Sequence, residues 1–313
     1  MQSRLKGYAC GIGAAVCYGT NPLGALFLYE DGINANSVLF YRFALAVVML
    51  GLLMAVKGKS LLVSGRELAL LAVLGVVFST SSMSLYFSFC FMDAGIASTL
   101  LFVYPVMVAV IMAVLFKERL SAAALFAIVL ALVGIALLYN GDGGVRLSTA
   151  GVLLVMLSSL SYAIYIVVVN KSPLRISSLK LTFYVLFFGM LTILANSFVS
   201  GIHIQMLTTP RMWLCAFMLA LLPTVFSLVL MVMAVHEIGS TPTAVMGALE
   251  PLTAVVIGVT VFGEQLTARL SVGIVLILLA VIIIVAGKSF SPARVIHVVS
   301  YLGHVISKTW RWK

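Results

Sequence analysis

Residues 241–262 read TPTAVMGALEPLTAVVIGVTVF, an apolar stretch long enough to cross a lipid bilayer as one helix. The stretch carries a carboxylate, Glu250, close to its middle, and Pro251 follows at once. A charge at that depth costs about 2.5–3.5 kcal/mol on insertion scales, so it marks a functional site by default. Proline frees the carbonyl of Gly247 and predicts a kink beside the acid. The kink can bind a polar solute or a proton; alternatively, Glu250 is a structural carboxylate paired with a tyrosine or serine of a neighbouring helix.

The whole chain has the composition of a membrane protein. Of its 313 residues 63% are hydrophobic and 9% are charged, and the mean hydropathy is +1.22, whereas soluble domains carry about 25% charged residues. The net charge of +10 does not indicate nucleic acid as a partner, because Lys and Arg lie in short loops and near the C-terminal end, as topology determinants do. The four cysteines show no ligand spacing, and we interpret them as small hydrophobic residues.

Ten apolar segments of about 20 residues predict an all-α membrane protein with ten transmembrane helices. Short breaks of turn or charged residues separate the segments and leave no room for strands. The first segment is too long for the hydrophobic region of a signal peptide, and we expect it to be retained. The segments are approximately 8–28, 35–56, 67–90, 95–116, 121–139, 150–170, 179–199, 212–235, 240–262 and 270–287.

The basic residues predict the orientation. With a cytoplasmic N-terminus, 15 of the 19 Lys and Arg lie in cytoplasmic segments and three, Arg146, Arg211 and Arg269, lie in outer loops, while Arg42 lies inside the second helix. The positive-inside rule therefore places both termini in the cytoplasm. We expect a multi-pass protein of the cell (inner) membrane.

The chain contains an internal repeat. Residues 101–120, LFVYPVMVAVIMAVLFKERL, align with residues 247–266, GALEPLTAVVIGVTVFGEQL. The repeat unit is five helices, and an odd number of spans forces the second copy to enter the membrane from the opposite side. Such inverted repeats are typical of secondary transporters, whose binding site lies near the midplane between the copies. The matched pairs are Pro105 with Pro251, Glu118 with Glu264 and Leu120 with Leu266.

The repeat divides the chain into four parts. The first five-helix unit is 8–139, the linker is 140–149, the second unit is 150–287, and a basic cytoplasmic tail is 288–313. Within the tail, polar and apolar residues alternate with helical spacing, so it predicts an amphipathic helix lying on the anionic inner leaflet. The tryptophans Trp310 and Trp312 would anchor it.

The order, spacing and duplication of these features resemble the EamA family of the drug/metabolite transporter superfamily. The resemblance covers about 8–139 and 150–285. It implies a ten-helix permease that moves small metabolites, often amino acids outward, by alternating access, but it does not carry over a particular substrate. The matching residues are the prolines of each fourth helix, the Glu-x-Leu turns at 118–120 and 264–266, Arg42 in FYRFALAVV, and Glu250–Pro251.

On this basis we expect an exporter or exchanger with a cavity at the midplane. Glu250 would bind a proton or the amine of the substrate, and Tyr18 and Tyr162, which are equivalent in the repeat, would line the cavity. Serines such as Ser84 can instead bond their own helix or a neighbour. The candidate lining residues are Glu250, Tyr18, Asn21, Ser84, Tyr104, Tyr162, Thr224, Ser227 and Met246, and the candidate hinges are Pro105, Pro223 and Pro251.

The first two helices raise three further alternatives. The small residues Gly7, Gly11, Ala15 and Gly19 recur every four positions and predict close helix packing. Asn21 and the proline after it either break the first helix at the cavity or cap it. Arg42 either snorkels to the outer headgroups with a structural or gating role, or is a charge partner for a substrate carboxylate or for the acids Glu30 and Asp93.

Other classes of protein find less support. No nucleophile triad, phosphate-binding loop or zinc motif occurs, so we expect no enzyme activity, no cofactor and no metal. A nucleotide-sugar or phosphorylated-metabolite exchanger would need more basic residues than Arg42 in the cavity. A non-transporting membrane protein is the remaining alternative. Glu250 is compatible with proton-coupled transport. We expect a small-molecule substrate and membrane lipids as partners, and a monomer or homodimer as the oligomeric state.

Overall fold

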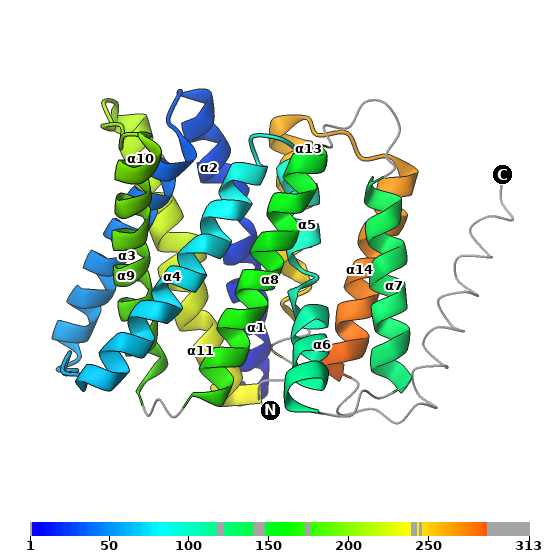
Figure 1. Cartoon of the computed structure of the whole chain (residues 1–313), viewed down its shortest axis with the longest axis horizontal. Helices are drawn as coiled ribbons and strands as arrows, with labels where there is room; N and C mark the ends of the chain where they lie inside the picture. The colour runs from blue at the N-terminus through cyan, green and yellow to red at the C-terminus, as the bar shows by residue number, and fades with distance from the viewer. Residues whose placement is uncertain are drawn as a thin grey trace, which may run out of the picture.

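The computed structural model describes residues 2–117, 122–139, 148–172, 176–238, 243 and 246–286. These residues form helices and no strand, and the long helices run side by side in one bundle (Figure 1). The helices are α1 (Gln2–Gly19), α2 (Asn21–Glu30), α3 (Ala35–Val56), α4 (Gly65–Ser88), α5 (Ala94–Leu101), α6 (Tyr104–Phe116), α7 (Ala122–Tyr139), α8 (Thr149–Lys171), α9 (Ser178–Ser200), α10 (Pro210–Ala220), the π-helix η1 (Leu221–Phe226), α11 (Ser227–Ile238), α13 (Leu249–Phe262) and α14 (Ala268–Ala286).

The helices confirm an all-helical, multi-pass membrane protein. Seven helical stretches of the described chain are long and apolar enough to span a bilayer, and three further apolar helices are shorter. The predicted Glu-x-Leu turn at 118–120, residues 140–147 of the predicted linker and the tail 288–313 lie outside the described residues. The seven stretches are Leu5–Glu30, Ala35–Val56, Gly65–Ser88, Ala94–Phe116, Thr149–Lys171, Ser178–Ser200 and Pro210–Val235, and the shorter helices are Ala122–Leu137, Leu249–Phe262 and Ala268–Ile283.

Local polar residues begin the helices at the ends of the bundle. The Asn34 side chain accepts a hydrogen bond from the amide of Ser37 at the start of α3. Ser64 and Glu67 form a reciprocal capping box at the start of α4. Because the first amides of a helix have no partner inside the helix, these side chains replace the water that would otherwise bind them.

Several spans are interrupted in their interior. Thr20 separates α1 from α2, Phe102 and Val103 separate α5 from α6, and a turn at Gly247 and Ala248 precedes α13. A break takes the place of the kink predicted at Pro251: the helix is interrupted at Gly247 and Ala248, and the proline lies in the first turn of α13, where its missing N–H costs nothing. The carbonyl of Gly247 is not free, because the amide of Glu250 donates to it at 2.9 Å.

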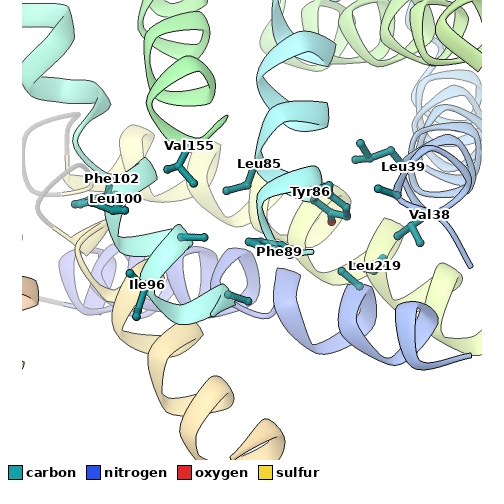
Figure 2. Close-up of a cluster of buried hydrophobic side chains, with 14 of the residues drawn as sticks. Val38, Leu39, Leu85, Tyr86, Phe89, Ile96, Leu100, Phe102, Val155 and Leu219 are labelled. Atoms are coloured by element: carbon teal, nitrogen blue, oxygen red, sulfur yellow. The ribbon is translucent and has the colours of Figure 1, made fainter. Parts of the chain in front are cut away.

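Close helix packing holds the bundle together. The most extensive contacts join α7 to α14, α1 to α11, and α4 to both α8 and α9. A Cβ at Gly134 of α7 would lie 2.9 Å from the backbone oxygen of Gly273 in α14, so only glycine permits this approach. The interior is filled by apolar side chains of many helices, including Leu39 of α3 and Tyr86 of α4 (Figure 2).

The small-residue face of α1 confirms the predicted close packing. A Cβ at Gly7 would lie 2.6 Å from Ile238, and a Cβ at Gly11 would overlap the sulfur of Met246. At Gly19 the added atom would lie 2.6 Å from the backbone oxygen of Glu250. The stripe therefore sets α1 against α11 and against the start of α13.

The turn after α13 fastens the second half of the bundle to α5. Gly263 has a φ of +67°, and Glu264 follows it and points back toward α5. One carboxylate oxygen accepts from the amide of Ala94 at 2.7 Å and the other accepts from the amide of Gly95 at 3.1 Å. Burial raises the pKa of the Glu264 carboxyl above its usual value, although the amide of Gly95 acts in the opposite direction. The matching residue of the first repeat, Glu118, lies outside the described residues.

We expect Glu264→Ala to destabilise the protein by about 1–3 kcal/mol, because it leaves the first amides of α5 without an acceptor in a partly buried place. Melting of the purified protein in detergent measures the change. Glu264→Gln keeps one acceptor oxygen, so its melting temperature should fall clearly less than that of Glu264→Ala. Equal melting of Glu264→Ala and wild type would show that the contact contributes nothing.

Candidate functional site

A cavity of about 170 Å³ lies inside the bundle, at the level where the helices are interrupted. Its walls come from both halves of the chain. Arg42 and Glu250 are its only charged residues among the described part of the chain. The lining residues are Tyr18, Gly19, Asn21, Pro22, Arg42, Phe78, Leu85, Ser98, Leu101, Phe102, Tyr104, Tyr162, Tyr165, Thr182, Val185, Leu186, Pro223, Thr224, Ser227, Leu228, Met231, Glu250, Pro251 and Ala254.

Glu250 is placed in the cavity by the break before α13. It is the second residue of α13, so its carboxylate lies at the positive end of that helix. Because residue 19 is glycine, the end of α1 packs directly against the first turn of α13, and this contact fixes the position of that turn. Within the described residues, the Glu250 side chain has no hydrogen bond or ion pair, which distinguishes it from the predicted structural carboxylate.

Arg42 is buried rather than snorkelled, and the snorkelling prediction is wrong. Its side chain is 5% exposed. The guanidinium donates from Nε to the hydroxyl of Thr224 at 3.1 Å and from Nη1 to the hydroxyl of Tyr86 at 2.8 Å. A buried guanidinium needs such partners, and Arg42 lines the cavity together with Thr224. The predicted acidic partner Glu30 instead faces Arg211, 3.7 Å away.

The two hydrogen-bond partners of Arg42 connect it to two irregular points in the helices, the break between α1 and α2 and the π-helix η1. The hydroxyl of Tyr86 donates to the side chain of Asn21 at 3.3 Å, and Asn21 donates to the carbonyl of Tyr18 at 2.9 Å across the break between α1 and α2. Thr224 belongs to η1. Arg42 therefore joins the break in the first span to the π-helix of the eighth apolar segment, and Asn21 lies at a break rather than at a simple cap.

The π-helix follows from a proline and a threonine in sequence. Pro223 has no N–H, so the carbonyl of Leu219 loses its ordinary helical donor. The hydroxyl of Thr224 donates to that carbonyl instead, at 3.2 Å. Such π-helical segments are frequent at functional sites, and Thr224 and Ser227 line the cavity here.

Four aromatic rings form one wall of the cavity. Tyr104 meets the ring of Tyr162 edge-on, with centroids 4.7 Å apart and planes at 81°. Tyr165 stacks on Tyr162 at 5.8 Å and 11°, and Phe78 contacts Tyr165 at 5.3 Å. Because each ring touches another, the wall is held by the stacking and edge contacts that aromatic pairs prefer.

Most of the predicted site residues converge at the cavity, but three do not. Ser84 is one residue before Leu85, which lines the cavity, and is therefore turned about 100° away around α4. Met246 precedes the break and packs on Gly11 of α1. Pro105 does not line the cavity either, although it starts α6. The other ten, which are at the cavity, are Glu250, Tyr18, Asn21, Arg42, Tyr104, Tyr162, Thr224, Ser227, Pro223 and Pro251.

Several other residues that line the cavity were not predicted from the sequence. Phe78 stands seven positions before Leu85 in the same hydroxyl-rich stretch, so the helical period could have placed it on the cavity face. Ser98 and Thr182 carry no such signal, because they reach the cavity only through the packing of α5 and α9. Among the described His, Cys, Asp and Glu residues, no group of three could hold a metal ion.

Taken together, the fold and the site define a class: a multi-pass membrane protein with a solute-sized cavity between broken helices, whose mainly apolar walls carry a few polar and charged side chains. The sequence model of the EamA-like transporter family matches residues 5–140 and again residues 149–286. The chain therefore belongs to the EamA-like transporter family, and it is a membrane transporter.

Relatives agree with this assignment. An uncharacterized transporter of Clostridium kluyveri is 24% identical over 289 residues, which cover 89% of this chain and 92% of the relative. An uncharacterized transporter of Archaeoglobus fulgidus is 29% identical over 61% of this chain and 67% of the relative. A protein of known crystal structure superposes with a TM-score of 0.60 at 16% identity, covering 88% of this chain and 95% of that one, which concerns the fold alone.

Proposed function

We propose that the protein is a secondary transporter that exports or exchanges small amphipathic metabolites such as amino acids by alternating access. One observation carries the proposal: the cavity holds one carboxylate, Glu250, and one guanidinium, Arg42. An amino acid carries the two complementary charges on one small body. Ten spans in two inverted repeats, with both termini on the cytoplasmic side of the inner membrane, complete the proposal.

The charges of the cavity are available to a substrate. In the part of the chain that the structure describes, no ion pair joins Arg42 to Glu250. A guanidinium has five N–H donors, and the bonds to Thr224 and Tyr86 use two of them. The remaining donors suit a carboxylate, which guanidinium groups bind with two parallel hydrogen bonds.

The helix contacts support the inverted arrangement. Under the repeat, α8 of the second unit corresponds to α1 of the first, and the span made of α10, η1 and α11 corresponds to α4. The contact of α1 with α11 and the contact of α8 with α4 are then the same contact made in both directions. The pairs α13 with α1 and α6 with α8 correspond in the same way. In Figure 1, α1 starts at the bottom of the view and α8 ends there, as opposite insertion requires.

The breaks support alternating access. In the alignment of 101–120 with 247–266 the interruptions at 102–103 and 247–248 share the pair Phe102 and Ala248 and are offset by one residue, and α5 packs against α13. Half-helices that meet at a cavity are the usual construction of solute sites in transporters. Rocking one unit against the other about these breaks would open the cavity to each face in turn.

The competing cargo is a nucleotide sugar or another phosphorylated metabolite. Phosphate groups require several basic donors, and Arg42 is the one basic residue among the described lining of the cavity. A proton that binds Glu250 would couple transport to the proton gradient, and a substrate amine at Glu250 would need no such coupling.

Counterflow in proteoliposomes tests the proposal without any assumption about a coupling ion. Vesicles are preloaded in turn with amino acids, nucleosides, sugars and sugar phosphates, and uptake of a trace of the labelled compound is measured. We expect amino acids to accelerate uptake. Leu132→Ala on the exposed face of α7 is the matched control and should transport as the wild type does. If only sugar phosphates accelerated uptake, the proposed amino-acid substrate would be wrong. If no class of compound accelerated uptake by folded protein, the proposal that the protein is a carrier would be contradicted.

A further inference from the structure

The aromatic wall has the geometry of a cation-binding corner. The planes of Tyr104 and Tyr162 stand nearly perpendicular, at 81°, so together they form two sides of a corner. Stacking of Tyr165 behind Tyr162 and the contact of Phe102 with Tyr104 hold both rings in place. A ring face carries negative electrostatic potential and attracts a cation that lies within about 6 Å of its centre.

Glu250 lies beside this corner. Its side chain lines the same cavity as Tyr104, Tyr162 and Tyr18. The aromatic corner and the one carboxylate among the described lining residues therefore belong to one cavity.

We propose that Tyr104, Tyr162 and Glu250 form a subsite for an organic ammonium group. The inference rests on the proposed function in placing a substrate in the cavity, and it deepens that function by assigning the residues that select the positive end. The carboxylate supplies the opposite charge, and the ring faces replace part of the water that an ammonium loses on entry. Neither contribution is available to a neutral group of the same size.

The subsite makes the ring, rather than the hydroxyl, the selective element at position 162. Phenylalanine keeps the ring face and should keep the preference for a cation, whereas leucine removes the face. A merely structural role of Tyr162 would change the affinity for charged and neutral ligands equally. The preference between the two ligands therefore separates recognition from packing.

Binding to the purified protein tests the subsite independently of transport. Isoamylammonium and isoamyl alcohol share their carbon skeleton and differ in the charged group. Each is titrated while the melting temperature is followed, because a ligand that binds the folded state raises this temperature with the logarithm of its concentration relative to its dissociation constant, so the titration gives the affinity. We expect wild type to bind the ammonium at least about tenfold more tightly than the alcohol, Tyr162→Phe to keep this ratio, and Tyr162→Leu and Glu250→Gln to reduce it to about twofold or less. Tyr104→Leu replaces Tyr162→Leu if the latter does not fold.

The control is Phe183→Leu, which removes an aromatic ring of α9 that does not line the cavity and should keep the wild-type ratio. Equal affinity of wild type for both ligands would overturn the subsite, and so would an unchanged ratio in Tyr162→Leu and Glu250→Gln. If the ammonium binds as expected while counterflow is silent, the transport proposal fails and the subsite stands. If counterflow proceeds and the ratio is close to one, the subsite fails and the transport proposal stands.

Discussion

Arg42→Lys is expected to reduce counterflow by about 10- to 100-fold, because a lysine cannot make both hydrogen bonds of Arg42 in the same geometry. The guanidinium is a planar fork that reaches Thr224 and Tyr86 together, whereas an ammonium is a compact point charge on a flexible stem. A hydrogen bond to a charged group contributes about 1.5–3 kcal/mol. Loss of one such bond would leave either the break at Asn21 or the π-helix without its contact to residue 42, and this would change the shape of the cavity.

The variants around Arg42 give this prediction its controls. Thr224→Val and Tyr86→Phe each remove one acceptor and should reduce transport less than Arg42→Lys. Arg211→Lys makes the same exchange at an exposed arginine that pairs with Glu30 and Asp31 and does not line the cavity, so it should have little effect on counterflow; pairs at the surface contribute about 0–1 kcal/mol. Wild-type transport by Arg42→Lys would show that the positive charge suffices and that the fork has no role.

The helical fold was predictable from the sequence because apolar length is a local property. A segment such as 35–56 must be a helix in a bilayer whatever its neighbours are, since only a helix satisfies its own backbone there. Glu250 was predictable for the same reason: a lone carboxylate in an apolar segment is conspicuous from its chemical type and its depth, without reference to any neighbouring helix. Residues whose importance follows from these two properties were therefore accessible from the amino-acid sequence alone.

Features that depend on neighbours were less accessible. The position of Arg42 along its helix is compatible with snorkelling, and only the placement of Thr224 and Tyr86 on other helices turns it inward. Ser84 has the right chemistry and faces away from the cavity because of its place around α4. Pro251 signalled a disturbance, but whether it kinks or starts a helix depends on the turn before it.

The second large effect is expected from the smallest substitution, Gly19→Ala. The added Cβ would lie 2.5 Å from the Cβ of Thr253 and 2.6 Å from the backbone oxygen of Glu250. Neither atom is the end of a flexible side chain, so the first turn of α13 has to move away from α1. Overpacking of this kind costs about 1–3 kcal/mol, and here it also displaces the carboxylate of the cavity.

We therefore expect Gly19→Ala to melt at a lower temperature than wild type and to lose about tenfold or more of its counterflow, a loss in the range of that overpacking cost. Gly13→Ala is the matched control in the same helix: its Cβ would meet only the tip of Leu230, at 3.3 Å, and alanine favours helix over glycine. This control should melt at the wild-type temperature or above and transport normally. If Gly19→Ala transported as well as Gly13→Ala, the approach of α1 to α13 would not determine where Glu250 acts. A loss confined to Gly19→Ala would instead show that one close contact between the two repeats positions the only carboxylate among the described residues that line the cavity.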